Sequence, residues 1–180
     1  MSKKIKYGFQ CGTLHTNFNI LKLVFLCILM LQIILACSTN PGYNITFGKG
    51  GNAEKYQKGG WSGPEEGFTW TDGKSATLLI PIGPPKSDII MNLSIYTPLV
   101  VPGKLENQRV IINVNGRKVV EWIITDAGEY NIKIPKDYIK GYFLNVGFEL
   151  PDAARPIDLG INTDTRELAL AIKTIKLSEN

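Results

Sequence analysis

The chain has 180 residues, 44% of them hydrophobic, and a formal net charge of +4. This length suits one independently folding domain once a leader is set aside. The positive charge belongs to the leader, because four of the 20 basic residues and none of the 16 acidic residues lie in the first 36 positions. The rest of the chain is balanced at zero net charge and has no basic stripe, which excludes nucleic acid as a partner.

The N-terminal part has the composition of a lipoprotein signal peptide. A basic, polar stretch precedes residues 23–36, LVFLCILMLQIILA, which are apolar except for Gln32. A run of 14 residues suits the hydrophobic region of a signal peptide and is shorter than the ~20 residues that a membrane-spanning helix needs. The run ends in Ala36-Cys37, which resembles a bacterial lipobox with a small residue before the cleavage site and a thiol that receives the lipid.

We therefore expect three parts: a lipoprotein signal peptide over residues 1–36, a lipidated tether over 37–42 and a β-sandwich domain over 43–180. Lipid on Cys37, with palmitate among its acyl chains, would anchor the protein in the bacterial cell envelope, since each buried CH₂ contributes ~0.8 kcal/mol. The residue after the lipid-bearing cysteine is Ser38 and not Asp. In a cell with two membranes, this favours the outer membrane, facing the periplasm. An uncleaved anchor helix is the alternative.

The folded part shows the alternation of apolar and polar residues that is typical of strands with one buried face. Eight or nine strands are expected between turns rich in Gly and Pro, and the clearest cover residues 43–47, 75–82, 88–96, 108–114, 118–124, 129–134, 142–150 and 168–177. The strongest local signal is Asn115-Gly116, because this pair supplies the two positive-φ residues of a type I′ hairpin turn.

Between the strands, residues 135–139 are expected to form a short helical turn, and residues 48–60 and 151–166 are expected to be irregular. No stretch has the period of an amphipathic helix. The pattern predicts an all-β fold, a two-sheet antiparallel sandwich that resembles a jelly roll.

Few side chains are suited to catalysis. The single histidine is His15, in the leader, and the three cysteines are in the same part: Cys11, Cys27 and Cys37. The folded domain therefore has no histidine or thiol for a nucleophilic triad, a zinc site or a disulfide. We expect a protein that is not an enzyme.

A glycoside hydrolase is the less favoured alternative, because it needs only two carboxylates that flank one bond. Glu65 and Glu66 are adjacent, so in an extended segment they point to opposite sides. Glu121, Glu129 and Glu149 lie on expected strands and could converge on a sheet face, but charged side chains at outward strand positions are usually just solvated.

Residues 60–73 form a loop-rich segment with the side chains typical of a glycan-binding site: Trp61, Glu65, Trp70 and Asp72. Sugar rings stack their C–H faces on aromatic rings, carboxylates bind the hydroxyls, and binding residues favour loops on a rigid scaffold. Packing against the core is the competing interpretation for both tryptophans. Trp122 lies on an expected strand, and packing against the core is the favoured interpretation for this residue.

Asp164 and Arg166 share a side of an extended segment, so they are expected to form a bidentate ion pair that pins residues 151–166, or to contribute to binding. Calcium often stabilises jelly rolls through oxygen ligands. Its candidate ligands are Asp72, Asp158 and Asp164, and no other cofactor is expected.

Three segments resemble one family in their order and spacing. They are Gly60-Trp61-Ser62 with Pro64-Glu65 and residues 70–73; residues 108–116, which end in Val-Asn-Gly; and Leu150-Pro151 with Leu159-Gly160, Asp164, Arg166 and Leu168. The family is the uncharacterised β-sandwich domain at the C-terminus of some bacterial membrane glycosyltransferases and phosphoglycerol-transferase-like proteins. The resemblance implies a carbohydrate-binding-like fold with no established catalytic role, here without the transferase.

These observations predict a non-catalytic envelope lipoprotein. Its expected partners are a membrane, through the lipid on Cys37, and a cell-envelope glycan or the enzyme that builds it. A structural or protein-interaction lipoprotein without a sugar site is the alternative interpretation.

Replacement of one thiol tests the predicted anchor. In a bacterial host, the Cys37→Ala variant should take up no labelled palmitate and should leave the membrane fraction, because no acyl chain is then attached. The Cys27→Ala variant keeps the lipid-bearing thiol and should label like the unchanged protein. Persistent labelling of Cys37→Ala would show that the modification lies elsewhere.

Overall fold

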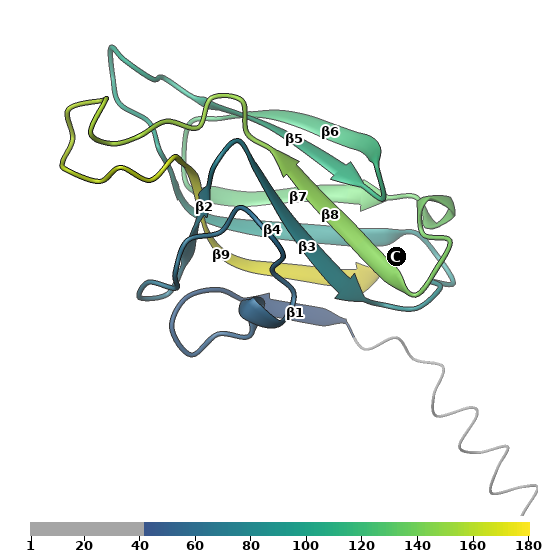
Figure 1. Ribbon diagram of the computed structural model, residues 1–180. Helices are drawn as coiled ribbons and strands as arrows, with labels where there is room; N and C mark the ends of the chain where they lie inside the picture. The colour runs from purple at the N-terminus through teal and green to yellow at the C-terminus, as the bar shows by residue number, and fades with distance from the viewer. Residues whose placement is uncertain (1–41) are drawn as a thin grey trace, which may run out of the picture. The chain divides into compact units, whose positions relative to one another are not determined.

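Figure 1 shows the computed structural model of the chain, which describes residues 42–180. The predicted signal peptide and nearly all of the predicted tether, with Cys37, lie outside the described residues. Within the described part, no helix is long and apolar enough to span a membrane.

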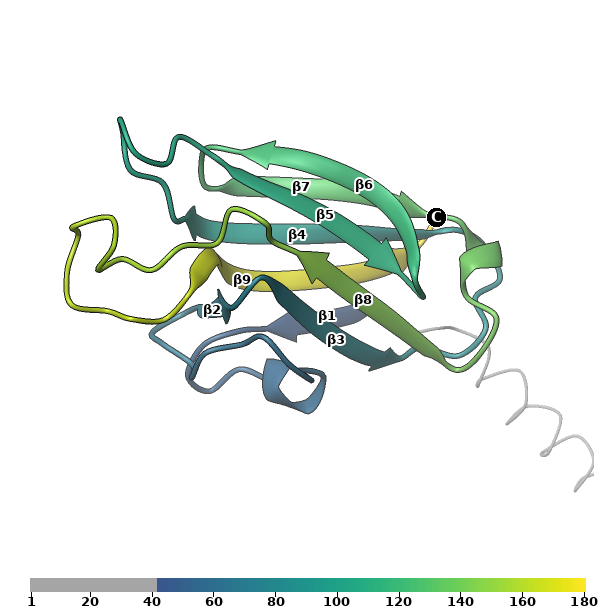
Figure 2. The ribbon, with the colours of Figure 1, turned by 45° about the horizontal axis from the view of Figure 1, so that its top comes forward.

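Nine strands form two antiparallel sheets in residues 42–180. The five-stranded sheet contains β1 (Tyr43–Thr46), β2 (Thr69–Asp72), β4 (Ile89–Pro98), β7 (Gly128–Ile134) and β9 (Leu168–Glu179). The four-stranded sheet contains β3 (Ser75–Pro81), β5 (Gln108–Val114), β6 (Arg117–Ile124) and β8 (Phe143–Glu149). Figures 1 and 2 show the two sheets stacked face to face, so the predicted all-β, two-sheet antiparallel sandwich is confirmed.

β9 organises the five-stranded sheet. The strand order is β1-β9-β4-β7, and β2 also pairs with β9. β1 and β2 follow one another along one edge of β9, and β4 pairs along the other edge. The four-stranded sheet has the order β3-β8-β5-β6.

The predicted hairpin is confirmed between β5 and β6. Asn115 and Gly116 have φ angles of 49° and 79°, and the residues that flank them, Val114 and Arg117, pair across the turn. The Asn115 amide donates to the Tyr138 carbonyl oxygen at 2.8 Å. This bond connects the hairpin to the 3-10 turn η2 (Lys136–Tyr138), which is the short helical turn that the sequence predicted.

The core lies between the sheets and is built from alternate residues of the strands. In β4 the residues at the inward positions are all buried, as the alternation predicted: Ile89, Met91, Leu93 and Ile95. The largest fully buried side chains from the other strands include Phe148, Ile45, Leu78, Ile112 and Leu170. At ~25 cal/mol per Å² of apolar surface, this burial is the main term that stabilises a domain without disulfides.

Within residues 60–73, which were expected to be a loop-rich segment, the sequence analysis missed one strand, β2 at residues 69–72. The inward residues of β2 are Thr69 and Thr71, whose polar side chains hid the strand pattern although both are buried. Their hydroxyl oxygens accept backbone N–H groups from Gly48 and Leu170, each at 3.1 Å. Buried polar groups satisfied in this way cost little.

The segment before β2 covers an edge of the four-stranded sheet. It contains a 3-10 turn, η1 (Ala53–Lys55), within the region expected to be irregular. After η1 the backbone pairs with β3. The Thr77 N–H donates to the Gly59 carbonyl oxygen and the Leu79 N–H donates to the Tyr56 carbonyl oxygen, both at 2.9 Å. A covered edge cannot add a strand from another chain.

Two glycines in this region allow a matched test of how closely the segment before β2 packs on β3. Gly60 and Gly67 have φ angles of 79° and 78°, so alanine at either position carries the same strain of about 1–2 kcal/mol. At Gly60 a methyl group would also collide with the Ser75 carbonyl oxygen of β3, whereas at Gly67 nothing lies within 4 Å. Denaturant unfolding should therefore show a larger loss of stability for Gly60→Ala than for Gly67→Ala. Equal losses would contradict the packing of this segment on β3.

Candidate functional site

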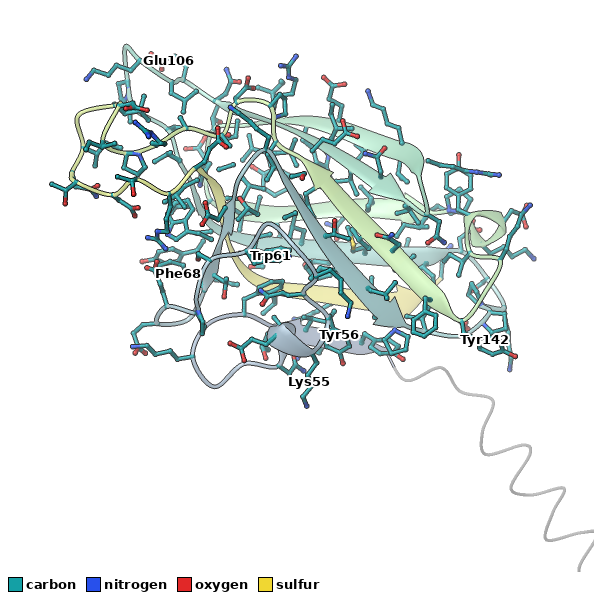
Figure 3. The ribbon with its side chains drawn as sticks, in the orientation of Figure 1. Lys55, Tyr56, Trp61, Phe68, Glu106 and Tyr142 are labelled. Carbon is teal, nitrogen blue, oxygen red and sulfur yellow. The ribbon has the colours of Figure 1, made fainter. Side chains whose placement is uncertain are left out.

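The two tryptophans of the predicted glycan site point to different sides of the five-stranded sheet. Trp61 packs against the core, with its ring centroid 5.2 Å from that of Phe47 and 5.8 Å from that of Phe148. Its indole N–H donates to the Thr77 carbonyl oxygen at 2.9 Å. Trp61 therefore closes the sandwich beside β3 (Figure 3).

Trp70 lies on the outer face of the five-stranded sheet, within a cluster of three aromatic rings. The Phe68 ring stacks on Tyr96 of β4, with centroids 4.5 Å apart and planes at 9°. The edge of Trp70 meets Phe68 at 6.2 Å and 88°. Phe68 and Trp70 are half-buried, and Tyr96 is 46% exposed. We call these three residues the aromatic cluster.

Irregular pairing between β4 and β9 contributes to the position of Tyr96. Ser94 pairs with Thr174, Ile95 with Ile172 and Thr97 with Ala171, so Lys173 and Tyr96 are each left as an extra residue in their strands. Such bulges redirect side chains. The Lys173 ammonium lies 5.0 Å from the Tyr96 ring centroid, which is a cation–π distance.

A group of three charged side chains forms a second part of the site. The Arg166 guanidinium binds both carboxylate oxygens of Asp164, with Nε to Oδ1 at 3.1 Å and Nη2 to Oδ2 at 2.6 Å. The remaining nitrogen, Nη1, reaches Glu65 at 3.2 Å. The bidentate pair predicted for Asp164 and Arg166 is thus present, and it connects the 151–166 segment to the loop before β2.

This arrangement shifts two pKa values. Hydrogen bonds from the Arg166 side chain and backbone lower the pKa of the Asp164 carboxyl group. The hydrogen bond with Asp164 raises the pKa of the Arg166 guanidinium, although burial acts in the opposite direction. Both groups are therefore charged at neutral pH, and the Nε–Nη2 edge of the guanidinium is already occupied by Asp164.

Asp72 has a structural role in the same region. Its Oδ1 accepts the backbone N–H of Glu167 at 3.0 Å, which holds the end of the 151–166 segment against β2. The other calcium candidates are also engaged separately, Asp158 with Arg155 and Asp164 with Arg166. Among the described residues, no three His, Cys, Asp or Glu side chains are grouped so that they could hold a metal ion.

A row of polar side chains crosses the outer face of the five-stranded sheet nearer the start of β1. Asn44, Lys176, Asn92 and Asn131 are successive cross-strand partners on β1, β9, β4 and β7. The Asn92 amide donates to Asn131 Oδ1 at 2.8 Å. These four residues, which we call the amide row, line a shallow hollow in the surface.

The aromatic cluster and the amide row share one face because both use outward positions of β4. The outward residues of this strand are Ile90, Asn92, Ser94 and Tyr96, which alternate with buried ones. Four residues of a strand span about 13 Å, so Asn92 and Tyr96 are far enough apart to contact different units of one extended ligand. The outer face combines apolar rings with amide donors and acceptors.

The carboxylates considered for a glycoside hydrolase do not come together. Glu121 and Glu149 lie opposite Ile111 on its two neighbouring strands, β6 and β8, whereas Glu129 belongs to β7 of the other sheet. Lys118 binds the Glu121 carboxylate, and the Asn113 amide donates to Glu149 at 2.7 Å. Glu121 and Glu149 are thus each engaged with a neighbour on their own sheet.

Sequence reasoning missed Phe68, Tyr96, Lys173 and the amide row. A signal was present for Tyr96, since the alternation that buries Ile95 leaves the next residue facing outward. The other residues share this face only through pairing with β9, which no local pattern reports.

No protein-family model matches the chain, and no curated protein is similar to it in sequence. The resemblance to the accessory domain of envelope transferases therefore remains a prediction. Several solved structures are similar in fold. One is a family GH115 4-O-methyl-α-glucuronidase with specificity for decorated arabinogalactans, at 12% identity and a TM-score of 0.49; the match covers 79% of this chain and 18% of that one.

Two carbohydrate-binding modules match over nearly their whole length. One is the CBM36-1 domain of a multidomain xylanase from the hindgut metagenome of Trinervitermes trinervoides, at 12% identity and a TM-score of 0.45, covering 77% of this chain and 98% of that one. The other is a family 35 module from an environmental isolate, at 12% identity and a TM-score of 0.45, covering 77% and 93%. The similarity is one of fold alone, a sandwich of the type found in carbohydrate-binding modules.

Acidification tests the role of the charged group. Because the pKa of Asp164 is lowered in the folded state, its ion pair stabilises the protein above the unfolded pKa of ~3.9, and this contribution is lost as the pH falls through the folded pKa.

At neutral pH, Asp164→Asn should increase amide hydrogen exchange in residues 155–166. Asp158→Asn, which removes a more exposed pair in the same segment, should have a smaller effect. Equal exchange in the two variants would mean that Asp164 does not hold the segment.

Proposed function

We propose that this protein is a non-catalytic lipoprotein of the bacterial cell envelope that binds an envelope glycan along the outer face of its five-stranded sheet. The observation that carries the proposal is the presence of the aromatic cluster and the amide row on one face, connected by β4.

The chemistry of this face suits an extended carbohydrate chain. Aromatic rings offer flat apolar surface to the C–H faces of sugar rings, and a large, partly exposed ring loses little conformational freedom on binding. Amide groups both donate and accept hydrogen bonds, as sugar hydroxyls do. Lys173 and Lys176 are exposed beside these groups, which favours a glycan that carries acidic substituents.

The predicted lipid on Cys37 supplies the location. It would confine the domain to the membrane surface, where envelope glycans are assembled, and Ser38 favours the outer membrane. The resemblance to the accessory domain of membrane glycosyltransferases supports the same assignment. The domain would then act by positioning the glycan.

A second candidate function is docking of a glycan-building enzyme or another envelope protein. It is favoured by Ile123, which is 61% exposed on β6, an edge strand of the four-stranded sheet. A large apolar side chain beside unpaired backbone groups is typical of protein contacts.

Binding of the detergent-solubilised full chain to an array of bacterial envelope glycans tests the proposal. Tyr96→Ala and Trp70→Ala should each weaken glycan binding roughly tenfold or more, which is about 1.4 kcal/mol. Tyr142→Ala, which removes a ring that is 73% exposed outside this face, serves as the matched control and should bind normally.

Each variant should first show an unchanged thermal unfolding midpoint. Trp70 is half-buried, so Tyr96→Ala is the more decisive of the two. An array on which the unchanged protein binds no glycan would end the glycan proposal. A loss of binding in Ile123→Ser alone would favour the second candidate.

A further inference from the structure

One end of the sandwich is defined by the residues that first enter it. Gly42, Tyr43 and Ile82 line one small hollow beside the connection between β3 and β4, and the Tyr43 hydroxyl donates to the Pro81 carbonyl oxygen. The Ile82 N–H donates in turn to the backbone carbonyl oxygen of Tyr142 at 3.0 Å. Figure 2 shows the start of β1, η2 and the C-terminus at this same end, which we call the tether end.

Two aromatic side chains project from the tether end. Tyr142 is 73% exposed and Phe143 is 53% exposed, and Figure 3 shows Tyr142 at the margin of the domain. Tyr138, from η2, lies beneath the Arg117 guanidinium at 4.9 Å. Exposed Tyr and Phe cost free energy in water, and rings of this kind are stabilised at a membrane interface.

Basic side chains surround these rings. Arg117, Lys136 and Lys140 line the same surface as Tyr142, and Asp137 is the acidic side chain among them. Within residues 42–180, neither Lys136 nor Lys140 has a carboxylate within salt-bridge distance. Elsewhere in that range, four lysines do have such a partner: Lys49, Lys74, Lys118 and Lys133. Asp88 pairs with Lys133 and also attracts Lys136, so the tether end has four basic side chains, Arg117, Lys133, Lys136 and Lys140, against the two carboxylates of Asp88 and Asp137.

The length of the tether limits how far this end can lie from a membrane. Residues 37–42 contain five peptide links between Cys37 and Gly42, which reach about 17 Å when fully extended. An anionic membrane surface attracts Lys and Arg within about a Debye length, ~8–10 Å at physiological salt. A lipid on Cys37 would thus hold the basic side chains within or close to the range of this attraction.

From these observations we infer that the tether end docks on an anionic phospholipid surface. Tyr142 and Phe143 lie at the level of the headgroups, and Arg117, Lys136 and Lys140 contact the phosphates. The inference rests on the proposed anchor at Cys37, and it adds a second, non-covalent contact that fixes the orientation of the domain on the membrane.

A fluorescent probe on the lipidated full chain in vesicles tests this contact. Gly141→Cys offers an exposed site with nothing within 4 Å of the new Cβ, and Thr163→Cys offers an exposed site in the 151–166 segment. Each thiol is labelled with an environment-sensitive dye. On vesicles that contain phosphatidylglycerol, the emission at position 141 should shift to shorter wavelength, and the emission at position 163 should not change.

Charge removal identifies the cause of the shift. Each of Lys136→Gln and Lys140→Gln should lower the ratio of docked to undocked protein about fivefold, which corresponds to ~1 kcal/mol per basic residue. Lys104→Gln removes one charge away from the tether end and should leave the shift unchanged. Vesicles of phosphatidylcholine alone should give a much smaller shift.

The two possible failures can be told apart. If the protein floats with the vesicles but the dye at position 141 reports the same environment on both lipids, docking is overturned and the anchor stands. If the protein does not float, or if the chain without an added thiol takes up dye at Cys37, the anchor fails and docking is overturned with it.

Discussion

The pairing of β9 with three other strands is the constraint on which the rest of the structure depends. Along one edge, β9 pairs with β1 and then with β2, and along the other it pairs with β4. Five consecutive residues of this strand, 168–172, are buried, as expected where a strand is covered on both faces. The strand also positions two residues of the candidate site, because Arg166 lies just before its start and Lys173 lies in its bulge.

The outer face of the five-stranded sheet acquires its chemistry from this pairing. β2, β9 and β4 bring Phe68, Trp70 and Tyr96 together from two separate regions of the chain. The ion pair of Arg166 with Asp164 and its bond to Glu65 connect the 151–166 segment to the segment that carries Phe68. Glu65, Asp164 and Arg166, which the sequence analysis selected, thus hold the segment next to the aromatic cluster. The sequence analysis did not predict that cluster.

Local patterns predicted most of the fold and little of the site. Asn115-Gly116 specifies its turn by backbone conformation alone, and the alternation in β4 reports burial directly. β2 was missed because Thr69 and Thr71 use hydroxyl groups to satisfy backbone donors in the interior, so they read as polar loop residues. Trp61 and Trp70 are close in sequence, but the turn between them sends one to the core and the other to the surface.

The neighbouring edge strands β6 and β7 have a consequence for how copies of the protein behave when crowded. The bulge in β6 near Val119 increases the local twist of the strand, and Arg117, Lys118 and Glu121 are exposed along it. In β7 the exposed positions include Glu129 and Lys133. Charges and irregular twist on an edge discourage a second copy from extending the sheet. Edge-to-edge association of two copies of the domain is therefore disfavoured.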